Sequence, residues 1–100
     1  MIEWTRVVGF DWDAGNARKS ADKHSVTQSE SEQAFFNQPL LILEDDRHSF
    51  AEPRFHALGR TDEDRRLQIT FTLRREAALI RVILARAMSA RQRLAYKKGE

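Results

Sequence analysis

Two strand-length apolar segments joined by a short polar turn constrain the fold of this chain most strongly. In Leu67–Leu73 hydrophobic residues alternate with polar ones, which is the period of a half-buried β-strand. Leu79–Ala85 is a β-branched and aliphatic segment of similar length, and residues 74–76 form a tight turn between the two. Because short turns join neighbouring strands antiparallel, the segments predict the centre of an antiparallel sheet.

The second of these segments carries a charge that packing does not require. Alternation predicts one face with Ile80, Val82 and Leu84, and another with Arg81, Ile83 and Ala85. Ser89 and Gln92 then fit a capping box, S-x-x-Q, which predicts the start of a helix. The basic residues of that helix are Arg91, Arg93, Lys97 and Lys98. The chain is therefore expected to end in a basic helix next to a central strand.

The remaining segments predict two more helices and three more strands. Asp13 is a candidate N-cap for a helix to about His24, and Thr27-x-x-Glu30 and Ser29-x-x-Glu32 are overlapping capping boxes for a helix to about Phe36. Strands are expected at Ile2–Phe10, Leu40–Glu44 and Arg54–Arg60, with an acidic loop over Asp45–Pro53. The sequence thus predicts one α+β domain over residues 1–100, in the order βααββββα, with an antiparallel sheet and a basic C-terminal helix.

Composition narrows the function classes. The chain has no cysteine, which excludes disulfides and thiolate chemistry, and no apolar segment approaches the roughly 20 residues of a membrane helix. A cytoplasmic protein without a membrane partner is expected. Residues 27–64 contain nine acids and three bases, whereas residues 79–100 contain six bases and one acid. This distribution favours a dipolar surface with an anionic ligand on one side, and an ordinary mixed surface is the alternative.

The polar side of the predicted sheet is the candidate binding surface. If Phe71 faces the helices, the opposite face carries Gln68, Thr70 and Thr72 beside Arg54, His56 and Arg60. Arg81 joins them if Ile80 and Val82 face the core. An arginine-bearing sheet face beside a basic helix is similar to an RNA-binding surface, and a protein-binding face is the alternative.

Several short motifs, in their order and spacing, resemble the BrnT family of ribonuclease toxins, members of the wider RelE-like group. Phe10–Asp13 (FDWD) resembles the family's F-E-W-D, and Lys23–Val26 (KHSV) its K-H-G-V. Asp45, His48-Ser49, Glu52 and Arg54-Phe55 follow its D-x-x-H-S-x-x-E-x-R-F pattern, in which Asp45 or its neighbour takes the place of the aspartate. Gly59-Arg60-Thr61 resembles its G-R-S turn, Ile80–Ala87 its I-R-I-I-S-A-R-x-A, and Gln92 to Tyr96 its E-R-x-x-Y.

The chain departs from the family pattern at several positions. Asn16 stands where the family usually has lysine, Leu84 stands for the serine of I-S-A-R, and Gln92 stands for glutamate. Ser20, Ser25 and Gln28 are further departures. These differences raise the alternative that the chain is a catalytically degenerate member that binds an antitoxin and regulates its operon without cleaving RNA.

The resemblance implies a RelE-like fold, cleavage of RNA without a metal or other cofactor, and inhibition of translation and growth. It also implies a BrnA-type antitoxin with a ribbon-helix-helix domain, through which alone the toxin would meet operator DNA. A dimeric or heterotetrameric assembly with the antitoxin is expected.

Cleavage of this kind needs a base for the 2′-hydroxyl, an acid for the leaving oxygen and cations for the phosphorane. Arginine suits the last role because it pairs with phosphate in a fork and stays charged. The candidate catalytic residues are Arg81, Arg86 and Arg54 as cations, with Glu52 and His24 as acid and base. The candidate RNA-binding residues are Lys23, Arg60, Arg91 and Tyr96.

Structural alternatives exist for each group of candidates. Arg81 and Arg54 have acidic residues within pairing reach, and Arg86 suits a carbonyl cap at the strand end. His24 suits a helix C-terminal cation, and the aromatic Tyr96 suits packing onto the sheet. His56 depends on strand register, and His48 lies in the acidic loop. The three histidines lack the close spacing of a zinc site, so no metal site is expected.

Overall fold

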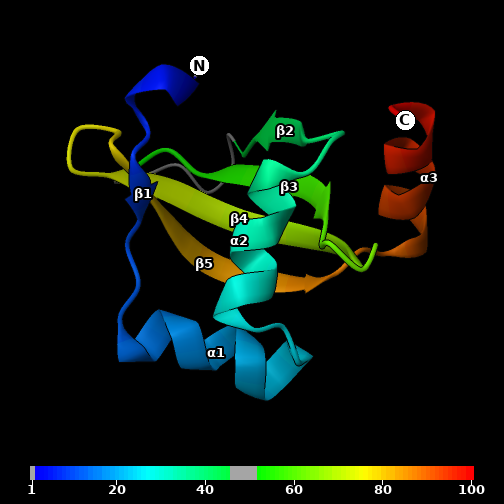
Figure 1. Ribbon diagram of the computed structural model, residues 1–100, viewed down its shortest axis with the longest axis horizontal. Helices are drawn as coiled ribbons and strands as arrows, with labels where there is room; N and C mark the ends of the chain where they lie inside the picture. Colours follow the sequence, from blue (N-terminus) through cyan, green and yellow to red (C-terminus); the bar gives the residue numbers. More distant parts are fainter. Residues whose placement is uncertain (1, 46–51) are drawn as a thin grey trace.

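The computed structural model describes residues 2–45 and 52–100, and over these residues it contains three α-helices and five strands. A short 3₁₀ helix, η1 (Trp4–Arg6), comes first (Figure 1). The elements that follow are β1 (Gly9–Phe10), α1 (Ala14–His24), α2 (Gln28–Phe36), β2 (Leu41–Glu44), β3 (Phe55–Arg60), β4 (Arg66–Arg74), β5 (Leu79–Ala87) and α3 (Ala90–Lys98). The α+β class and the order βααββββα are confirmed. Most of the expected loop Asp45–Pro53, including His48, lies outside the described residues.

The strands form one sheet in the order β1-β5-β4-β3-β2. Strands β2 to β5 pair antiparallel, as predicted, but β1 pairs parallel to β5 through Gly9 and Phe10. The expected first strand over Ile2–Phe10 is therefore wrong for most of its length. Its end at Phe10 is as expected, but its first part is missing because Trp4–Arg6 form the 3₁₀ helix η1 instead of extended backbone.

Helix α1 continues the protection of the β5 edge where β1 stops. The Asn16 amide Nδ2 donates to the Val82 carbonyl at 3.1 Å, and the Ala85 N–H donates to the Ser20 hydroxyl at 2.8 Å. Both side chains are buried. Because unpaired backbone groups at a buried edge are costly, these two polar residues give α1 its position along β5.

All three helices begin at the residues that the sequence indicates. The Asp13, Thr27 and Ser89 side chains each accept a hydrogen bond from the third residue of their helix, and that residue's side chain bonds back to the cap. Such reciprocal capping satisfies N–H groups that a helix start leaves unpaired. Gln92, one departure from the family motif, is thereby part of a working cap.

A β-bulge in β5 overturns the predicted alternation of that strand. Val82 pairs with Phe71 and Leu84 pairs with Thr70, so Ile83 is an extra residue between them. Ala85 consequently points into the core, where it is fully buried, and Leu84 faces the opposite side. The expectation that Leu84 shares a face with Ile80 and Val82 is wrong. The expectation that Arg81 lies on the polar side of the sheet is confirmed.

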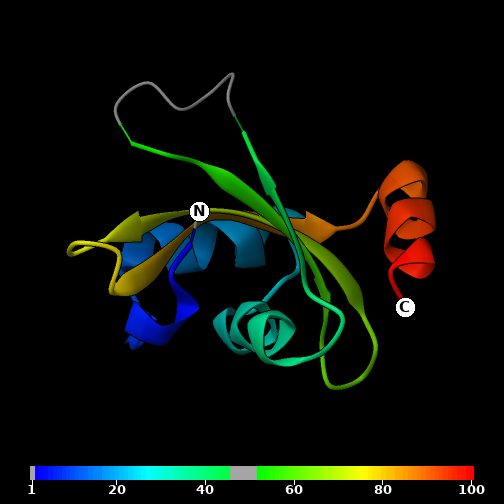
Figure 2. The same ribbon diagram turned by 90° about the horizontal axis from the view of Figure 1, so that it is seen from above.

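The main core lies between the sheet and α2, which crosses one face (Figure 2). Phe35 of α2 packs edge-on against Phe71 of β4, with ring centroids 5.1 Å apart. Gly59 allows this close approach, since a Cβ there would lie 2.6 Å from the Ala34 carbonyl oxygen. A second cluster of Leu58, Met88 and Tyr96 fixes α3 at the end of the sheet. The side of the sheet away from the main core is therefore only partly covered.

Candidate functional site

The candidate site is the side of the sheet that faces away from α2. We call it the polar face and define it by His56, Gln68, Thr70, Thr72, Arg81 and Arg86. Three cross-strand pairs establish it: His56 with Thr70, Gln68 with Arg86, and Thr72 with Arg81. The core residues Ile69, Phe71 and Val82 alternate with these on the opposite side. The predicted polar, arginine-bearing face is confirmed in its register.

His56 lies at the centre of a hydrogen-bond network on the polar face. Its Nε2 is 2.9 Å from Asp45 Oδ2, and its Nδ1 is 2.8 Å from the Thr70 hydroxyl and 3.1 Å from the Gln68 amide nitrogen. The Gln68 amide also donates to Thr70 Oγ1 at 2.9 Å. Gln68 and Thr70 are buried, and 33% of the His56 side chain is exposed. The ring is thus held at both ends by fixed partners.

The network holds the His56 ring through both of its nitrogens. The Gln68 amide nitrogen donates to Thr70 Oγ1 and lies 3.1 Å from Nδ1, and the Asp45 carboxylate is within hydrogen-bond distance of Nε2. Every polar atom of the ring is therefore occupied by the protein itself.

Arg81 is held by two carboxylates at the β1 end of the sheet. Its Nη2 is 2.7 Å from Asp13 Oδ2, and its Nη1 is 3.5 Å from Asp11 Oδ2. The Asn16 backbone N–H and then Arg81 lower the pKa of the Asp13 carboxyl, and Asp13 in turn raises the pKa of Arg81. The structural alternative for Arg81, pairing with a neighbouring acid, is therefore what the structure shows.

Arg86 has a different environment from Arg81. Its Nη1 donates to the Ala87 carbonyl at 3.2 Å, and no carboxylate pairs with it among residues 2–45 and 52–100. The carbonyl cap considered from the sequence is present, but it leaves the charge uncompensated. Of the arginines in the polar face, Arg86 is the one best able to attract a phosphate.

The candidates Glu52 and Arg54 lie at the same end as Arg81. The Thr72 hydroxyl donates to the Pro53 carbonyl at 2.5 Å, which places residues 52–54 next to the Thr72–Arg81 pair. The Glu52 carboxylate is 3.1 Å from Arg74 Nη2. Arg54 is half-buried just before β3, and Glu52, the nearest acid in its sequence, contacts Arg74.

His24 and Lys23 are not brought to the polar face with Arg81. They end α1, eleven residues beyond the Asp13 that binds Arg81, which is about 16 Å along the helix axis. The His24 carbonyl accepts a hydrogen bond from Arg65 Nη2 at 3.2 Å. Lys23 lines a shallow hollow on the outer side of α1, together with Arg18 and Lys19. A single site that combines His24 with Arg81 is therefore not formed.

Tyr96 is a correction among the RNA-binding candidates. Its ring is fully buried, its hydroxyl donates to the Pro39 carbonyl at 2.6 Å, and Arg66 lies over the ring at 5.0 Å from its centroid. Burial raises the pKa of the Tyr96 hydroxyl. With no open ring face, Tyr96 cannot stack on a base, and packing onto the sheet is its role.

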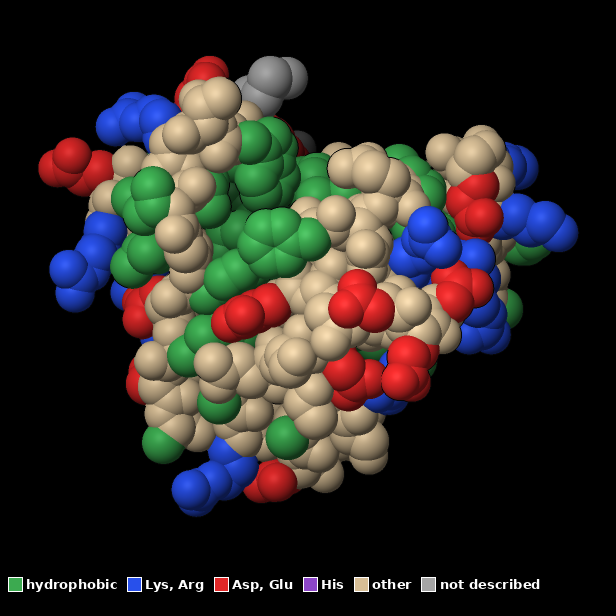
Figure 3. Space-filling model, in the orientation of Figure 1, with side chains coloured by type: hydrophobic (Ala, Val, Ile, Leu, Met, Phe, Trp, Pro, Cys, Tyr) green, Lys and Arg blue, Asp and Glu red, His purple; other side chains and the backbone are tan. Residues whose placement is uncertain are grey.

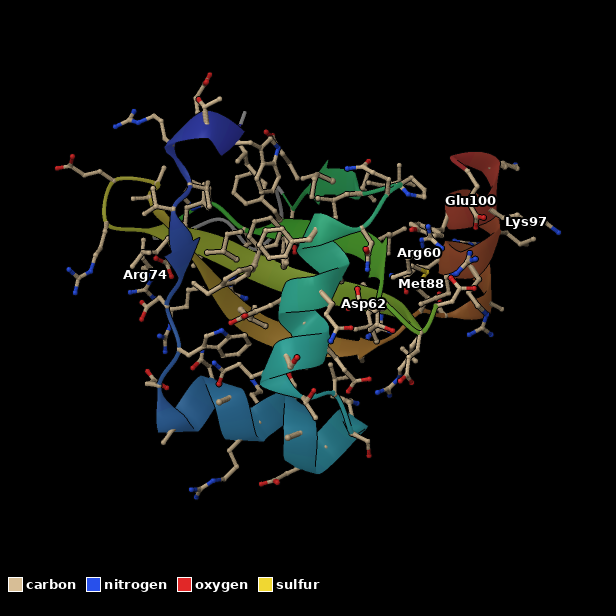
Figure 4. The ribbon with its side chains drawn as sticks, in the orientation of Figure 1. Arg60, Asp62, Arg74, Met88, Lys97 and Glu100 are labelled. Carbon is tan, nitrogen blue, oxygen red and sulfur yellow. The ribbon has the colours of Figure 1, made fainter. Side chains whose placement is uncertain are left out.

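The other two RNA-binding candidates lie around α3. Arg60 is near Lys97 and Glu100, at the end of the molecule opposite Arg74 (Figure 4). Arg60 Nε donates to the Gln38 carbonyl at 2.8 Å, and its Nη1 is 3.5 Å from Asp64. Arg91 is exposed in the first turn of α3, shortly after Arg86. Arg91 has no carboxylate partner among the described residues, whereas Arg60 is already paired.

Sequence reasoning left out the Asp45–His56 pair. His56 depends on strand register, which a single sequence does not fix. Asp45 matches the aspartate of the family's loop pattern, but that pattern does not show that its carboxylate bonds His56 across the β2–β3 pair. The available signal was the placement of Gln68 and Thr70 on the same side as His56. Polar residues at alternate strand positions need partners when buried, and a histidine across the ladder supplies one.

A second surface is apolar and lies on the other side of the molecule. Trp4, Val8 and Phe36 are exposed, and they border a hollow of about 220 Å³ between the N-terminal segment and the end of α2. Figure 3 shows hydrophobic side chains gathered in this region. Contiguous exposed apolar side chains on a small protein mark a surface that a partner can cover.

Two observations concern metals and membranes. Among the described residues, no three histidine, cysteine or carboxylate side chains cluster closely enough to hold a metal ion. Within the same residues, the helices are too short and too polar to span a bilayer.

Comparison with known proteins gives one family. Residues 12–92 match the family described as ribonuclease toxin, BrnT, of type II toxin–antitoxin system. A search of curated protein sequences found no match. The matched region extends from the residue before the α1 cap into the first turn of α3, so it contains the whole polar face.

Proposed function

Because the chain belongs to the BrnT family of ribonuclease toxins of type II toxin–antitoxin systems, we propose that it is an endoribonuclease that binds RNA on the polar face. We propose that cleavage proceeds without a metal ion, stops translation and growth in the cytoplasm, and is blocked by a BrnA-type antitoxin. The observation that carries the proposal is that the region matched to the family contains Arg86. This arginine has no carboxylate partner among the described residues and lies on a sheet face lined with hydrogen-bonding side chains.

The charges of the polar face support an RNA ligand. Arg86, and Arg91 five residues later in the chain, are suited to backbone phosphates, since RNA affinity depends largely on phosphate neutralisation. Arg81, Arg54 and Glu52 lie together at the other end, where they are proposed to complete the cleavage site. The donor set favours acid–base and arginine chemistry, which needs no metal ligand cluster.

The apolar hollow beside Trp4, Val8 and Phe36 supports the proposed antitoxin partner. It lies on the opposite side of the sheet from the polar face, so a protein could cover it while a further segment reaches the RNA surface. We propose that assembly with a dimeric ribbon-helix-helix antitoxin gives a dimer or heterotetramer and brings the toxin to operator DNA.

One set of contacts favours the alternative of a degenerate, antitoxin-binding member. Arg81 is compensated by Asp11 and Asp13, Glu52 is paired with Arg74, and Leu84 places an apolar side chain on the polar face. The departures Asn16 and Gln92 carry less weight, because both have structural roles here: Asn16 bonds β5 and Gln92 completes the α3 cap.

Inducible expression in a bacterial host distinguishes the two functions. We expect growth arrest and loss of intact RNA when the chain is expressed alone, and relief of both when the gene of its antitoxin is expressed with it. Normal growth with intact RNA, at confirmed expression of folded protein, would instead support the degenerate alternative.

A further inference from the structure

The exposed part of His56 is flanked by an exposed leucine. Leu43 of β2 pairs in register with His56 of β3, on the same side of the sheet, and is 58% exposed. The two side chains form an amphipathic ledge beside Thr70. This leucine lies on the edge strand β2, at the border of the polar face, and the core on the opposite side of the sheet does not explain its exposure.

The hydrogen bonds of His56 limit what its ring can do. Nε2 is bonded to Asp45, and Nδ1 is bonded to Thr70 and Gln68. A general base needs a nitrogen within reach of the substrate proton, and here each nitrogen already has protein partners. What remains accessible is the carbon surface of a ring whose orientation is fixed by these contacts.

The charges around His56 indicate where the phosphate and the base of a bound RNA would lie. The Asp45 carboxylate, with only 11% of its side chain exposed, bonds Nε2 of the ring, so the protein already occupies that position. The uncompensated Arg86 lies one cross-strand pair further along the sheet and attracts an anion. A strand of RNA that places a phosphate at Arg86 therefore brings an uncharged group over His56 and Leu43.

We propose that His56 and Leu43 form a stacking platform for one unpaired base of single-stranded RNA. The inference rests on the proposed RNA-binding function and adds to it the form of the substrate and a residue that contacts it. Aromatic and apolar side chains on sheets bind splayed-out bases in this way, and rigid double-stranded RNA cannot present such a base. His56 is thus a binding residue, and Asp45, Thr70 and Gln68 are positioning residues.

The test separates base stacking from proton transfer. Affinity is measured with a 2′-O-methyl single-stranded oligonucleotide, which binds without being cleaved, and cleavage with the unmodified oligonucleotide under single-turnover conditions. His56→Phe retains a ring without nitrogens, and His56→Ala removes it. We expect roughly 5- to 150-fold weaker binding for His56→Ala, corresponding to 1–3 kcal/mol per stacked base, and affinity near that of the parent for His56→Phe.

Leu43→Ala provides a second variant that does not disturb the network, because Leu43 is exposed. It is expected to weaken binding of the single strand several-fold, whereas Val8→Ala, which changes an exposed apolar residue on the other side of the molecule, leaves the affinity for RNA unchanged. Thermal unfolding confirms that each variant is folded. Parental affinity in both His56→Ala and Leu43→Ala would overturn the platform, and so would a loss of affinity in folded His56→Phe as large as that in His56→Ala.

The outcome is independent of whether the protein cleaves RNA. If the parent binds the single strand through His56 and Leu43 but never cleaves the unmodified oligonucleotide, the platform stands and the proposed ribonuclease activity fails. Equal affinity for the single strand and its duplex would overturn the platform while leaving the activity open.

Discussion

At the scale of single residues, the turn between β4 and β5 holds the most unusual backbone. Arg75, Glu76 and Ala77 follow one another with φ values of 53°, 58° and 70°. Left-handed backbone costs about 1–2 kcal/mol for a residue with a Cβ, and glycine avoids that cost. This exposed turn is therefore a place where stability can be increased without touching the core.

We predict that Ala77→Gly raises the free energy of unfolding by about 1 kcal/mol. Ala78→Gly is the matched control, because Ala78 lies outside the left-handed run and its N–H donates to the Arg74 carbonyl at 3.1 Å. There glycine only adds freedom to the unfolded chain and lowers stability by about 0.5–1 kcal/mol. Urea unfolding measures both; equal losses for the two variants would show that Ala77 is not strained.

Residue identity alone predicted some side-chain roles and not others. The three capping residues were predictable because a cap depends on neighbours three positions away. The position of Leu84 was not, because one extra residue, Ile83, reverses the alternation after it. The roles of Asn16 and Ser20 were hidden for a related reason, since their partners are 65 residues or more away in the sequence.

At the scale of elements, Glu30 links the α1–α2 connection to the turn after β3. Its carboxylate accepts from the Thr27 backbone N–H at 3.0 Å and pairs with Arg65 Nη1 at 3.1 Å. Arg65 also donates to the carbonyls of Ser25 and His24. The Thr27 N–H and then Arg65 lower the pKa of the Glu30 carboxyl from its ordinary value.

A lowered pKa makes this contribution dependent on pH. The folded state favours the ionised carboxylate, so the stabilisation is complete above about pH 5 and is lost as the pH falls through the lowered pKa. We expect Glu30→Gln, which keeps the cap, to lower the free energy of unfolding at pH 7 by roughly 0.5–1 kcal/mol. In acid the parent and the variant should converge.

Denaturant unfolding across this pH range tests the prediction, with Glu63→Gln as the control. Glu63 is exposed in the turn between β3 and β4, and its removal should leave the pH dependence of the parent unchanged. A constant difference between parent and Glu30→Gln from neutral to acid pH would contradict a role for the Glu30 charge.

At the scale of the whole molecule, charge counts from the sequence give only part of the surface. The middle of the chain is acidic and its end is basic, but the fold brings many of these opposite charges together in ion pairs. Arg66 pairs with Asp64 and Glu100, Arg65 with Glu30, and Arg74 with Glu52. Pairing across the sheet cannot be read from a count. In the described chain it leaves Arg86, the exposed bases of α3, and Arg18, Lys19 and Lys23 of α1 without a carboxylate partner. The basic charge is therefore spread differently over the fold than along the sequence.

The most direct test of the account is cleavage of a labelled single-stranded RNA by the purified protein in excess EDTA. We predict that the parent cleaves the RNA and that Arg86→Ala cleaves it at least about 10-fold more slowly, because a phosphate loses its cation. Arg75→Ala, at the far turn, should match the parent. RNA that stays intact with folded parent protein, or that is cleaved only after a divalent metal is added, would contradict the account.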